Sequence, residues 1–209
     1  YSKSWEGKNN TILINDVRYS PAGVLAPIQR SDLAFTMHML YHLSETGTCA
    51  IVEFPGVLYR GGAEKKIREY LIKNNFVDTV IQLPANLFFG VGIATCIIVI
   101  KKNKKDNNIL FVDASEECEK KGDKNKLEDE NQNRIVNAYQ ERKEEQYFTK
   151  LVSNDEVLAN GANLSVSSYV EKEDKREVID IVALNEEIEA LSKDVRNRSV
   201  ELDEMIKEL

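Results

Sequence analysis

The chain has 209 residues and an acidic balance, with 35 Asp and Glu against 28 Lys and Arg and a formal net charge of −7. This balance excludes a protein whose whole surface is a basic platform for nucleic acid, and no apolar run reaches the roughly 18 residues that a membrane-spanning helix needs. The three cysteines, Cys49, Cys96 and Cys118, form no CxxC pair, so we expect reduced thiols in a soluble, cytoplasmic protein.

Charge divides the chain into two unlike halves. Residues 1–112 contain 13 Lys and Arg against 9 Asp and Glu, a balance of +4, whereas residues 113–209 contain 15 against 26, a balance of −11. The acidic half would repel a phosphate backbone and is better suited to binding protein. The chain begins with Tyr1, without an initiator Met or a signal peptide, and we interpret it as part of a longer protein.

The first predicted elements are two helices with a strand between them. Ser31 and Asp32 can cap a helix that runs through LAFTMHMLYHLSE and ends at Gly47. Residues 49–54 are apolar and follow as a strand. A second helix is predicted over about residues 63–74, where apolar side chains recur at the spacing of one helix face.

Two further strands flank a loop that carries adjacent aromatic residues. Residues 77–83 and 95–100 are short β-branched runs, typical of buried strands, and the loop between them contains Phe88 and Phe89. In open α/β sheets ligands bind outside the carboxyl ends of strands, so a planar side chain in this loop is well placed to face a planar substrate. The alternative interpretation is that both phenylalanines cap a core.

The alternation of helices and buried strands predicts a sheet. Parallel strands need crossover connections and read as continuous apolar runs, so we expect a mainly parallel sheet covered by helices on both faces. After residue 100 the polar segment KKNKKDNN and the short strand ILFV indicate a closing hairpin, and hence an antiparallel edge. No glycine-rich strand-to-helix turn is followed by an acidic residue about 20 positions later, so no cofactor-binding residue is predicted within this chain.

The second half begins as a polar connector. Residues 113–127 have few apolar side chains and mixed charges, which indicates a loop or a partly ordered segment. A helix is predicted over about residues 128–143, followed by short packing elements that end near Val170.

The last forty residues contain an apolar stripe with the spacing of a coiled-coil seam. The stripe residues recur at alternating intervals of four and three, with Arg198 in the one position that breaks the stripe; they are Leu184, Ile188, Leu191, Val195, Leu202, Met205 and Leu209. A lone helix of this kind gains little stability until its stripe is packed. We therefore predict a partner helix, and the alternative is that the helix folds back on the sheet.

Several segments together resemble the carboxyl half of the modification subunit of type I restriction-modification systems. The strings that carry the resemblance are YSKSW, DLAFTMHMLYHL, AIVEFPGVLYRGGAEKKIREYLI, VIQLPANLFFGVGIATCIIVIKK, ILFVDAS and NLSVSSYV. That family consists of N6-adenine DNA methyltransferases that depend on S-adenosylmethionine. The resemblance implies the carboxyl half of a Rossmann-like α/β methyltransferase sheet, with an α-helical C-terminal extension.

The resemblance also implies roles for two aromatic residues. Tyr1 resembles the last residue of the family's Asn-Pro-Pro-Tyr or Asn-Pro-Pro-Phe motif, a catalytic residue that stacks on the flipped adenine, and Phe88 would pack against the base from another direction. Stacking offsets part of the cost of taking a base out of the duplex. The Asn and both prolines would lie upstream, as would most of the S-adenosylmethionine site, so we expect the 209 residues alone to be inactive.

Other polar residues are weaker candidates. Arg60 follows the strand at 49–54 and is a possible DNA contact, as are four lysines after residue 100, although solvated loops are the alternative in both cases; the lysines are Lys101, Lys102, Lys104 and Lys105. His38 and His42 have a metal-ligand spacing, but no third ligand is evident and no metal is predicted. Glu53 is an acidic residue in an apolar strand without an evident partner.

The predicted organisation has three parts. Residues 1–112 would be the C-terminal part of a methyltransferase catalytic domain, residues 113–170 a connector and domain extension, and residues 171–209 a coiled-coil-like helix for subunit assembly. The partners that the resemblance implies are the specificity and restriction subunits of a type I complex, and duplex DNA within it. The alternative function is a noncatalytic assembly module that presents a helix to a partner. A different nucleotide enzyme is disfavoured, because no Mg²⁺-binding motif is visible.

Overall fold

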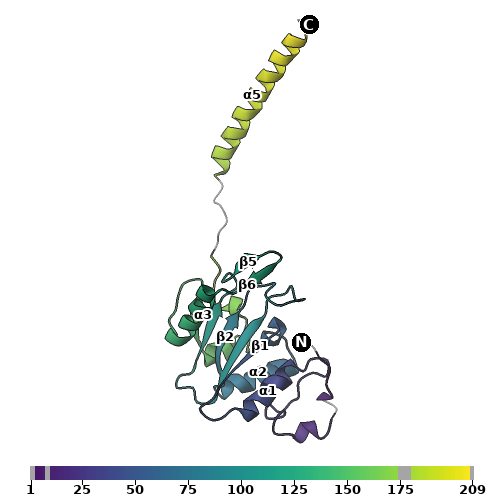
Figure 1. Ribbon diagram of the computed structural model, residues 1–209, viewed down its shortest axis with the longest axis vertical. Coiled ribbons are helices and arrows are strands. Elements are labelled where there is room, and N and C mark those ends of the chain that lie inside the picture. Colours follow the sequence, from purple (N-terminus) through teal and green to yellow (C-terminus); the bar gives the residue numbers. More distant parts are fainter. Residues whose placement is uncertain (1–2, 8–9, 174–179, 208–209) are drawn as a thin grey trace. The chain divides into compact units, whose positions relative to one another are not determined.

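The computed structural model describes residues 3–7, 10–173 and 180–207, except for the side chains at positions 200, 201, 204 and 207. The chain divides into two units, Tyr1–Lys172 and Glu173–Leu209 (Figure 1). The first unit is an α/β domain and the second contains a single described helix. The predicted division of the first unit at residue 112 stays a prediction.

A five-stranded sheet forms the centre of the first unit, in the order β1-β3-β2-β4-β7. Its strands are β1 (Thr48–Glu53), β2 (Val77–Gln82), β3 (Cys96–Lys101), β4 (Asn108–Asp113) and β7 (Thr149–Ser153). Only β2 and β4 pair in parallel, whereas β3 is antiparallel to both β1 and β2, and β7 is antiparallel to β4. The expectation of a mainly parallel sheet is therefore wrong.

The connection between β2 and β3 explains this difference. A parallel neighbour needs a crossover, usually a helix, but residues 83–95 form no helix, so the chain turns back and β3 runs antiparallel to β2. The predicted hairpin after residue 100 is also wrong, because β2 lies between β3 and β4. The connecting segment instead crosses the start of β2, where Lys104 Nζ donates to the Val77 carbonyl at 2.7 Å. Antiparallel edges do occur, at β1 and β7.

Helices cover both faces of the sheet, as expected. On one face pack α1 (Asp32–His42), α2 (Ala63–Lys73) and α4 (Asn154–Ala159), and on the other packs α3 (Asp129–Glu141). Strand β4 shows how two cores arise, because successive side chains of a strand point to opposite faces. Ile109 and Phe111 enter the core under α1 and α2, whereas Leu110 and Val112 enter the core under α3.

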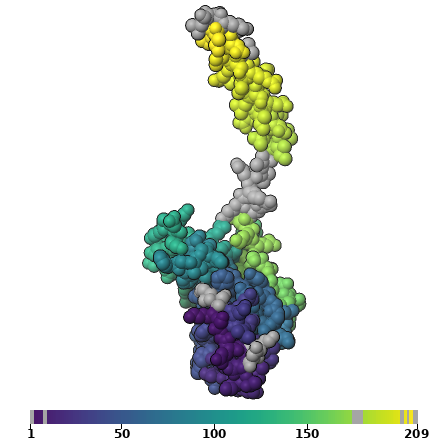
Figure 2. All heavy atoms as spheres, turned by 90° about the vertical axis from the view of Figure 1, so that its right-hand side faces the viewer, coloured from purple at the N-terminus to yellow at the C-terminus, as the bar shows by residue number. Residues whose placement is uncertain are grey.

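The ends of α1 differ from the prediction. Ser31 occupies the N-cap position but makes no side-chain capping bond, and the helix ends at His42 because Leu43 is extended, with φ −69° and ψ 130°. Before α1, the described residues of the segment 3–30 form turns and bends together with the short 3-10 helix η2 (Leu13–Asn15). This segment lies on the surface of the first unit, in purple in Figure 2. The beginning of this segment is bonded to the N-cap of α1, because Ser31 N donates to the Lys3 carbonyl at 3.0 Å.

The predicted polar loop over residues 113–127 contains a hairpin. Strands β5 (Glu119–Lys121) and β6 (Lys124–Lys126) pair antiparallel, and Gly122 turns between them with φ +62°. The remaining short elements of this unit are the 3-10 helices η3 (Pro55–Leu58) and η4 (Val166–Ser168). The Phe111 and Tyr169 rings stack with centroids 4.3 Å apart, which anchors the end of the unit on β4.

The second unit contains helix α5 (Ile181–Lys207). The predicted stripe lies on this helix with its apolar side chains exposed: Leu184, Ile188, Leu191, Val195, Leu202 and Met205. The seventh stripe residue, Leu209, lies outside the described residues. Among the helices that the structure describes, none is both long and apolar enough to span a bilayer.

Candidate functional site

The carboxyl ends of three strands meet at one edge of the sheet. Because β1 and β2 are both antiparallel to β3, they run in the same direction, and β4 runs parallel to β2. The segments that leave these ends are residues 54–62, 83–95 and 114–118. Ligands of open α/β sheets bind outside such ends, and this edge is called the carboxyl edge below.

Residues 83–95, called the aromatic loop below, close on themselves at this edge. Leu83 N donates to the Thr95 carbonyl at 2.9 Å, and Val91 N donates to the Phe88 carbonyl at 3.2 Å. Phe88 is 38 % exposed and Phe89 is 100 % exposed. Phe89 therefore caps no core, and the loop presents two neighbouring aromatic rings to solvent. That is an arrangement on which a planar group can stack.

The β5–β6 hairpin is docked against the aromatic loop. Asn125 Nδ2 donates to the Ala85 carbonyl at 2.8 Å, and Asn125 N donates to the Asn86 carbonyl at 3.2 Å. Lys124 Nζ lies 3.5 Å from the Phe88 carbonyl. Prediction from sequence missed these residues, because three-residue polar strands show no apolar alternation. The Gly122-Asp123 pair was the available signal, since a glycine followed by Asp is a common two-residue hairpin turn.

Arg60 lies at the same edge and is held by a buried carboxylate. Its Nη1 is 3.5 Å from Glu64 Oε1, and Arg30 Nη1 is 3.5 Å from Glu64 Oε2. Glu64 is almost fully buried, whereas the Arg60 side chain is 22 % exposed. A side chain at Gly56 would meet the Arg60 guanidinium and require it to move. The two guanidinium groups are thus pinned by one carboxylate while part of each faces solvent.

Glu53 ends β1 and has a partner that the sequence did not reveal. Thr36 Oγ1, on α1, donates to Glu53 Oε1 at 3.0 Å. The pKa of Glu53 is raised to about 7, mainly by burial; the Thr36 hydrogen bond opposes this shift and the neighbouring Asp32 adds to it. Glu53 and Asp32 line a pocket of about 190 Å³ together with Lys3.

The four lysines after residue 100 lie at the opposite edge of the sheet. Lys101 pairs with Thr48, the first residue of β1, and its Nζ is 3.2 Å from the buried Asp78 carboxylate. Lys102 Nζ donates to the Leu43 carbonyl at 2.5 Å. Burial lowers the pKa of Lys104 to about 8, and its Nζ is bonded to Val77. Lys105 is exposed. The structure therefore separates these lysines from Phe88 and brings Arg60 to the Phe88 edge.

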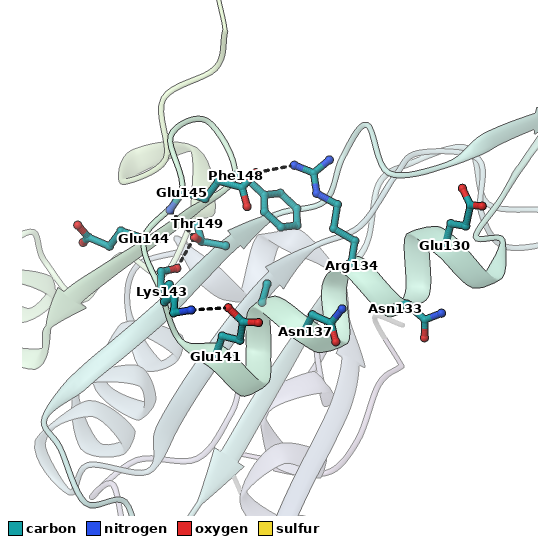
Figure 3. A pocket seen from close by; sticks show the side chains of 11 residues that line it. Glu130, Asn133, Arg134, Asn137, Glu141, Lys143, Glu144, Glu145, Phe148 and Thr149 are labelled. Carbon is teal, nitrogen blue, oxygen red and sulfur yellow. Dashed lines mark hydrogen bonds and ion pairs between the residues drawn. The ribbon is translucent and has the colours of Figure 1, made fainter.

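A larger pocket of about 620 Å³ lies between α3 and residues 143–149 (Figure 3). Figure 3 shows Arg134 reaching from α3 across the Phe148 ring, with its Cζ 4.1 Å from the ring centroid. Arg134 is paired with Glu145 at 2.8 Å and with Glu117 at 2.6 Å. Four glutamates line this pocket against two cations: Glu130, Glu141, Glu144 and Glu145 against Arg134 and Lys143. Its negative balance disfavours a phosphate-bearing ligand.

The remaining candidates are distributed as follows. The rings of His38 and His42 are 4.6 Å apart, and His38 Nδ1 is 3.2 Å from the Tyr19 hydroxyl. No group of three or more His, Cys, Asp or Glu side chains is placed to hold a metal in the described part of the chain. Tyr1 lies outside the described residues, although Lys3 is at the carboxyl edge.

Comparisons with known proteins agree on one class. The family model described as N-6 DNA Methylase matches residues 1–178. The chain is 44 % identical over 211 residues to the type I restriction enzyme MpnII methylase subunit of Mycoplasma pneumoniae, covering 99 % of this chain and 39 % of that protein. It is 34 % identical over 190 residues to the MjaVII methylase subunit of Methanocaldococcus jannaschii, covering 88 % and 32 %.

A solved structure shows the same fold. The type I restriction-modification system methyltransferase subunit from Streptococcus thermophilus superposes with a TM-score of 0.79 at 41 % identity, over 82 % of this chain and 36 % of that one. The α/β methyltransferase-like fold expected from the sequence is thereby confirmed. The chain spans less than two fifths of the length of these relatives.

Proposed function

This chain belongs to the N-6 DNA methylase family, whose model matches residues 1–178, and we propose that the whole protein methylates the N6 atom of adenine in duplex DNA as the modification subunit of a type I system. S-adenosylmethionine is the proposed methyl donor, as the family implies. A protein with this substrate is expected in the cytoplasm.

The observation that carries the proposal is the exposed aromatic loop at the carboxyl edge. The exocyclic amine of adenine cannot be reached inside a duplex, so the base must be swung out into a pocket, at a cost of a few kcal/mol. Stacking on an aromatic side chain contributes about 1–3 kcal/mol per base, which offsets much of that cost. Phe88 is half-exposed in a loop closed by backbone bonds, and we assign it one face of the base.

The proposed partner of Phe88 is Tyr1, on the other side of the adenine. Tyr1 lies outside the described residues. Its assignment is supported by the resemblance of the chain's start to the family motif and by Lys3, which lines a pocket at the carboxyl edge. The group that makes the amine nucleophilic would be the motif's Asn together with a backbone carbonyl, neither of which is in this chain.

The methyl donor has no assigned contacts here. When bound, S-adenosylmethionine supplies an electrophilic methyl sulfonium, but the described residues contain no glycine-rich strand-to-helix turn that fits its methionine or nucleoside part. We therefore assign most of its site to residues of the whole protein that lie outside this chain.

We further propose that Arg60 contacts the DNA backbone near the target. Arg60 lies at the carboxyl edge, on the segment after β1, and its guanidinium is pinned by Glu64 with part of its surface open. A preordered guanidinium suits phosphate recognition. The lysines at positions 101, 102, 104 and 105 lie at the other edge of the sheet. The geometry therefore favours Arg60 as the contact near the target base. DNA binding by the lysines stays a prediction.

The proposed partners are the specificity and restriction subunits of a type I complex. Helix α5 carries an exposed apolar stripe on 27 residues, which suits packing against helices of another chain. The same stripe favours the second candidate function, a noncatalytic assembly module. That function does not explain why the aromatic loop exposes two aromatic rings.

The test of the proposed function is Phe88→Ala in the full-length subunit assembled with its partners. Loss of base stacking should lower kcat/KM for methylation of target DNA by about 10- to 100-fold, which corresponds to the stacking energy above. Phe88→Trp keeps an aromatic face and should retain most of the activity. The readout is transfer of a labelled methyl group from S-adenosylmethionine to a duplex that contains one target adenine.

Tyr41→Ala is the matched control. Tyr41 is an aromatic residue of similar exposure on α1, near Lys102 in a pocket away from the carboxyl edge. It should leave methylation unchanged. If Phe88→Ala keeps the wild-type activity, Phe88 does not belong to the base pocket. If the assembled wild-type complex transfers no methyl group, the noncatalytic assembly module is the better account.

A further inference from the structure

We propose that the β5–β6 hairpin is a DNA-binding element, in which Lys120 and Lys124 bind backbone phosphates beside the flipped base. The inference rests on the proposed function and deepens it, because it assigns a phosphate contact beside the proposed base pocket. It stands on three properties of the hairpin: how it is attached, how its charge is arranged and where its ammonium groups lie.

The hairpin is attached to the aromatic loop rather than to the body of the sheet. Asn125 makes two hydrogen bonds to this loop: its side-chain amide donates to the Ala85 carbonyl, and its backbone N donates to the Asn86 carbonyl. The hairpin stands out at the rim of the first unit, where β5 and β6 are labelled in Figure 1. Any backbone that brings a base to Phe88 must therefore pass close to the hairpin.

The charge of the hairpin is unusual for its half of the chain. Its eight residues, 119–126, include four lysines against Glu119 and Asp123, a local balance of +2 within a half that totals −11. Lys121 lies directly opposite Lys124 in the strand register, and like charges in that position destabilise a hairpin. Within the described part of the chain only one member of this pair, Lys121, has a carboxylate partner, so an anion beside Lys124 would stabilise the hairpin.

Glu128 neutralises only half of the hairpin's lysines. Its carboxylate pairs with Lys121, and with Lys126 at 3.0 Å, and these two lysines hold its pKa below the usual range. Neither Lys120 nor Lys124 forms an ion pair with a carboxylate in the parts of the chain that the structure describes. Two ammonium groups thus remain available to an external anion.

The two available lysines flank the contact between the hairpin and the aromatic loop. Lys120 is directly opposite Asn125 in the strand register, and Asn125 is the residue whose side chain donates to the loop. Lys124 Nζ lies 3.5 Å from the Phe88 carbonyl. A flipped nucleotide stays joined to its own phosphates, which places anions at the rim of the pocket, where these lysines are.

The experiment compares Lys120→Gln/Lys124→Gln with the wild type in the assembled, full-length complex. The affinity for duplex DNA is measured over a series of salt concentrations, with one duplex that contains the target site and one that does not. Removing one phosphate-binding ammonium group should reduce the slope of log K against log salt by about 1. We expect the double variant to reduce the slope by about 1 to 2, equally for the two duplexes, and to raise KM for DNA with an unchanged kcat.

The matched control is Lys73→Gln, which removes an exposed lysine at the C-terminal end of α2. It should leave the slope unchanged. The proposal is overturned if the hairpin variant keeps the wild-type slope, if Lys73→Gln lowers it equally, or if the hairpin variant instead loses its partner subunits. Failure of the proposed function is a separate result, because it would appear as absent methylation by the wild-type complex.

Discussion

At the scale of single residues, Glu53 is the most unusual group in the domain. It is 2 % exposed at the end of β1 and accepts a hydrogen bond from Thr36. Burial raises its pKa from 4.5 to about 7, so near neutral pH the carboxyl group is partly protonated in the folded chain. Because the pKa of Glu53 differs between the folded and the unfolded chain, its ionisation couples the stability of the domain to pH.

The direction of this coupling follows from proton binding. Between pH 4.5 and about 7 the folded chain keeps a proton on Glu53 that the unfolded chain has released, so the free energy of unfolding falls as pH rises. The stabilising contribution is fully present below pH 4.5 and is lost as pH rises through about 7. The shift corresponds to roughly 3 kcal/mol at most.

Glu53→Gln should remove this pH dependence. A neutral amide can still accept from Thr36, and it carries no ionisation penalty, so the variant should be more stable than the wild type above pH 7 by up to roughly 3 kcal/mol. Urea unfolding of both proteins across this pH range gives the readout. Glu45→Gln, at a carboxylate that is 87 % exposed, should follow the wild-type curve. Parallel curves for Glu53→Gln and the wild type would contradict the assignment.

At the scale of secondary-structure elements, one buried guanidinium joins three segments. Arg68, on α2, donates from Nε to the Ala162 carbonyl at 2.7 Å and from Nη1 to the Val57 carbonyl at 2.9 Å. Burial lowers its pKa to about 10, which still leaves it charged at neutral pH. A direct bond from Leu164 N to the Leu58 carbonyl, 2.9 Å long, lies beside it. Arg68 thus holds residues 160–164 against η3, which precedes Arg60.

Arg68→Met should destabilise the domain by about 3 kcal/mol or more, because it leaves two buried carbonyls without charged donors. The loss should be local first, with faster amide hydrogen exchange at residues 157–164 than in β2. Arg68→Lys should recover part of the stability, since an ammonium can reach only one of the two carbonyls well. Lys66→Met, two residues earlier on α2 and exposed, is the control. A small effect of Arg68→Met, no larger than that of the control, would show that water replaces the guanidinium.

At the scale of the whole molecule, we propose that α5 mediates assembly. Ile188 is 51 % exposed and Leu191 is 58 % exposed, and both belong to the apolar stripe. A stripe of this spacing stabilises a helix when it packs against another helix. A charged side chain in the stripe should therefore prevent packing while leaving the sheet domain intact.

Ile188→Glu/Leu191→Glu should abolish association with the specificity subunit and leave the melting temperature of the sheet domain unchanged. The association is measured by light scattering after size-exclusion chromatography of the co-expressed subunits. Lys193→Glu is the matched control, because it makes the same change in net charge at an outer position of α5 and should assemble normally. Normal assembly of the stripe variant would place the subunit contact elsewhere on the chain.

The sequence by itself determined the family and most of the longer elements. Strands such as β4 are recognisable because NILFVD places apolar residues on both faces, a pattern that depends only on local burial. The α2 and α5 helices follow from the spacing of their apolar residues, and Phe88 stood out as an aromatic residue in a loop after a buried strand. These signals are local, so the amino-acid sequence alone is enough to identify them.

The tertiary structure alone decided the sheet order and the surroundings of the site. Strand pairing depends on contacts between distant residues, and nothing in residues 95–113 showed that β2 would lie between β3 and β4. Contacts between distant residues also decide three features of the site. They separate Lys101 to Lys105 from Phe88, place Thr36 beside Glu53, and place Asn125 beside the aromatic loop. Each of these is a contact between segments that are apart in the chain, and such contacts are fixed by packing rather than by local propensity.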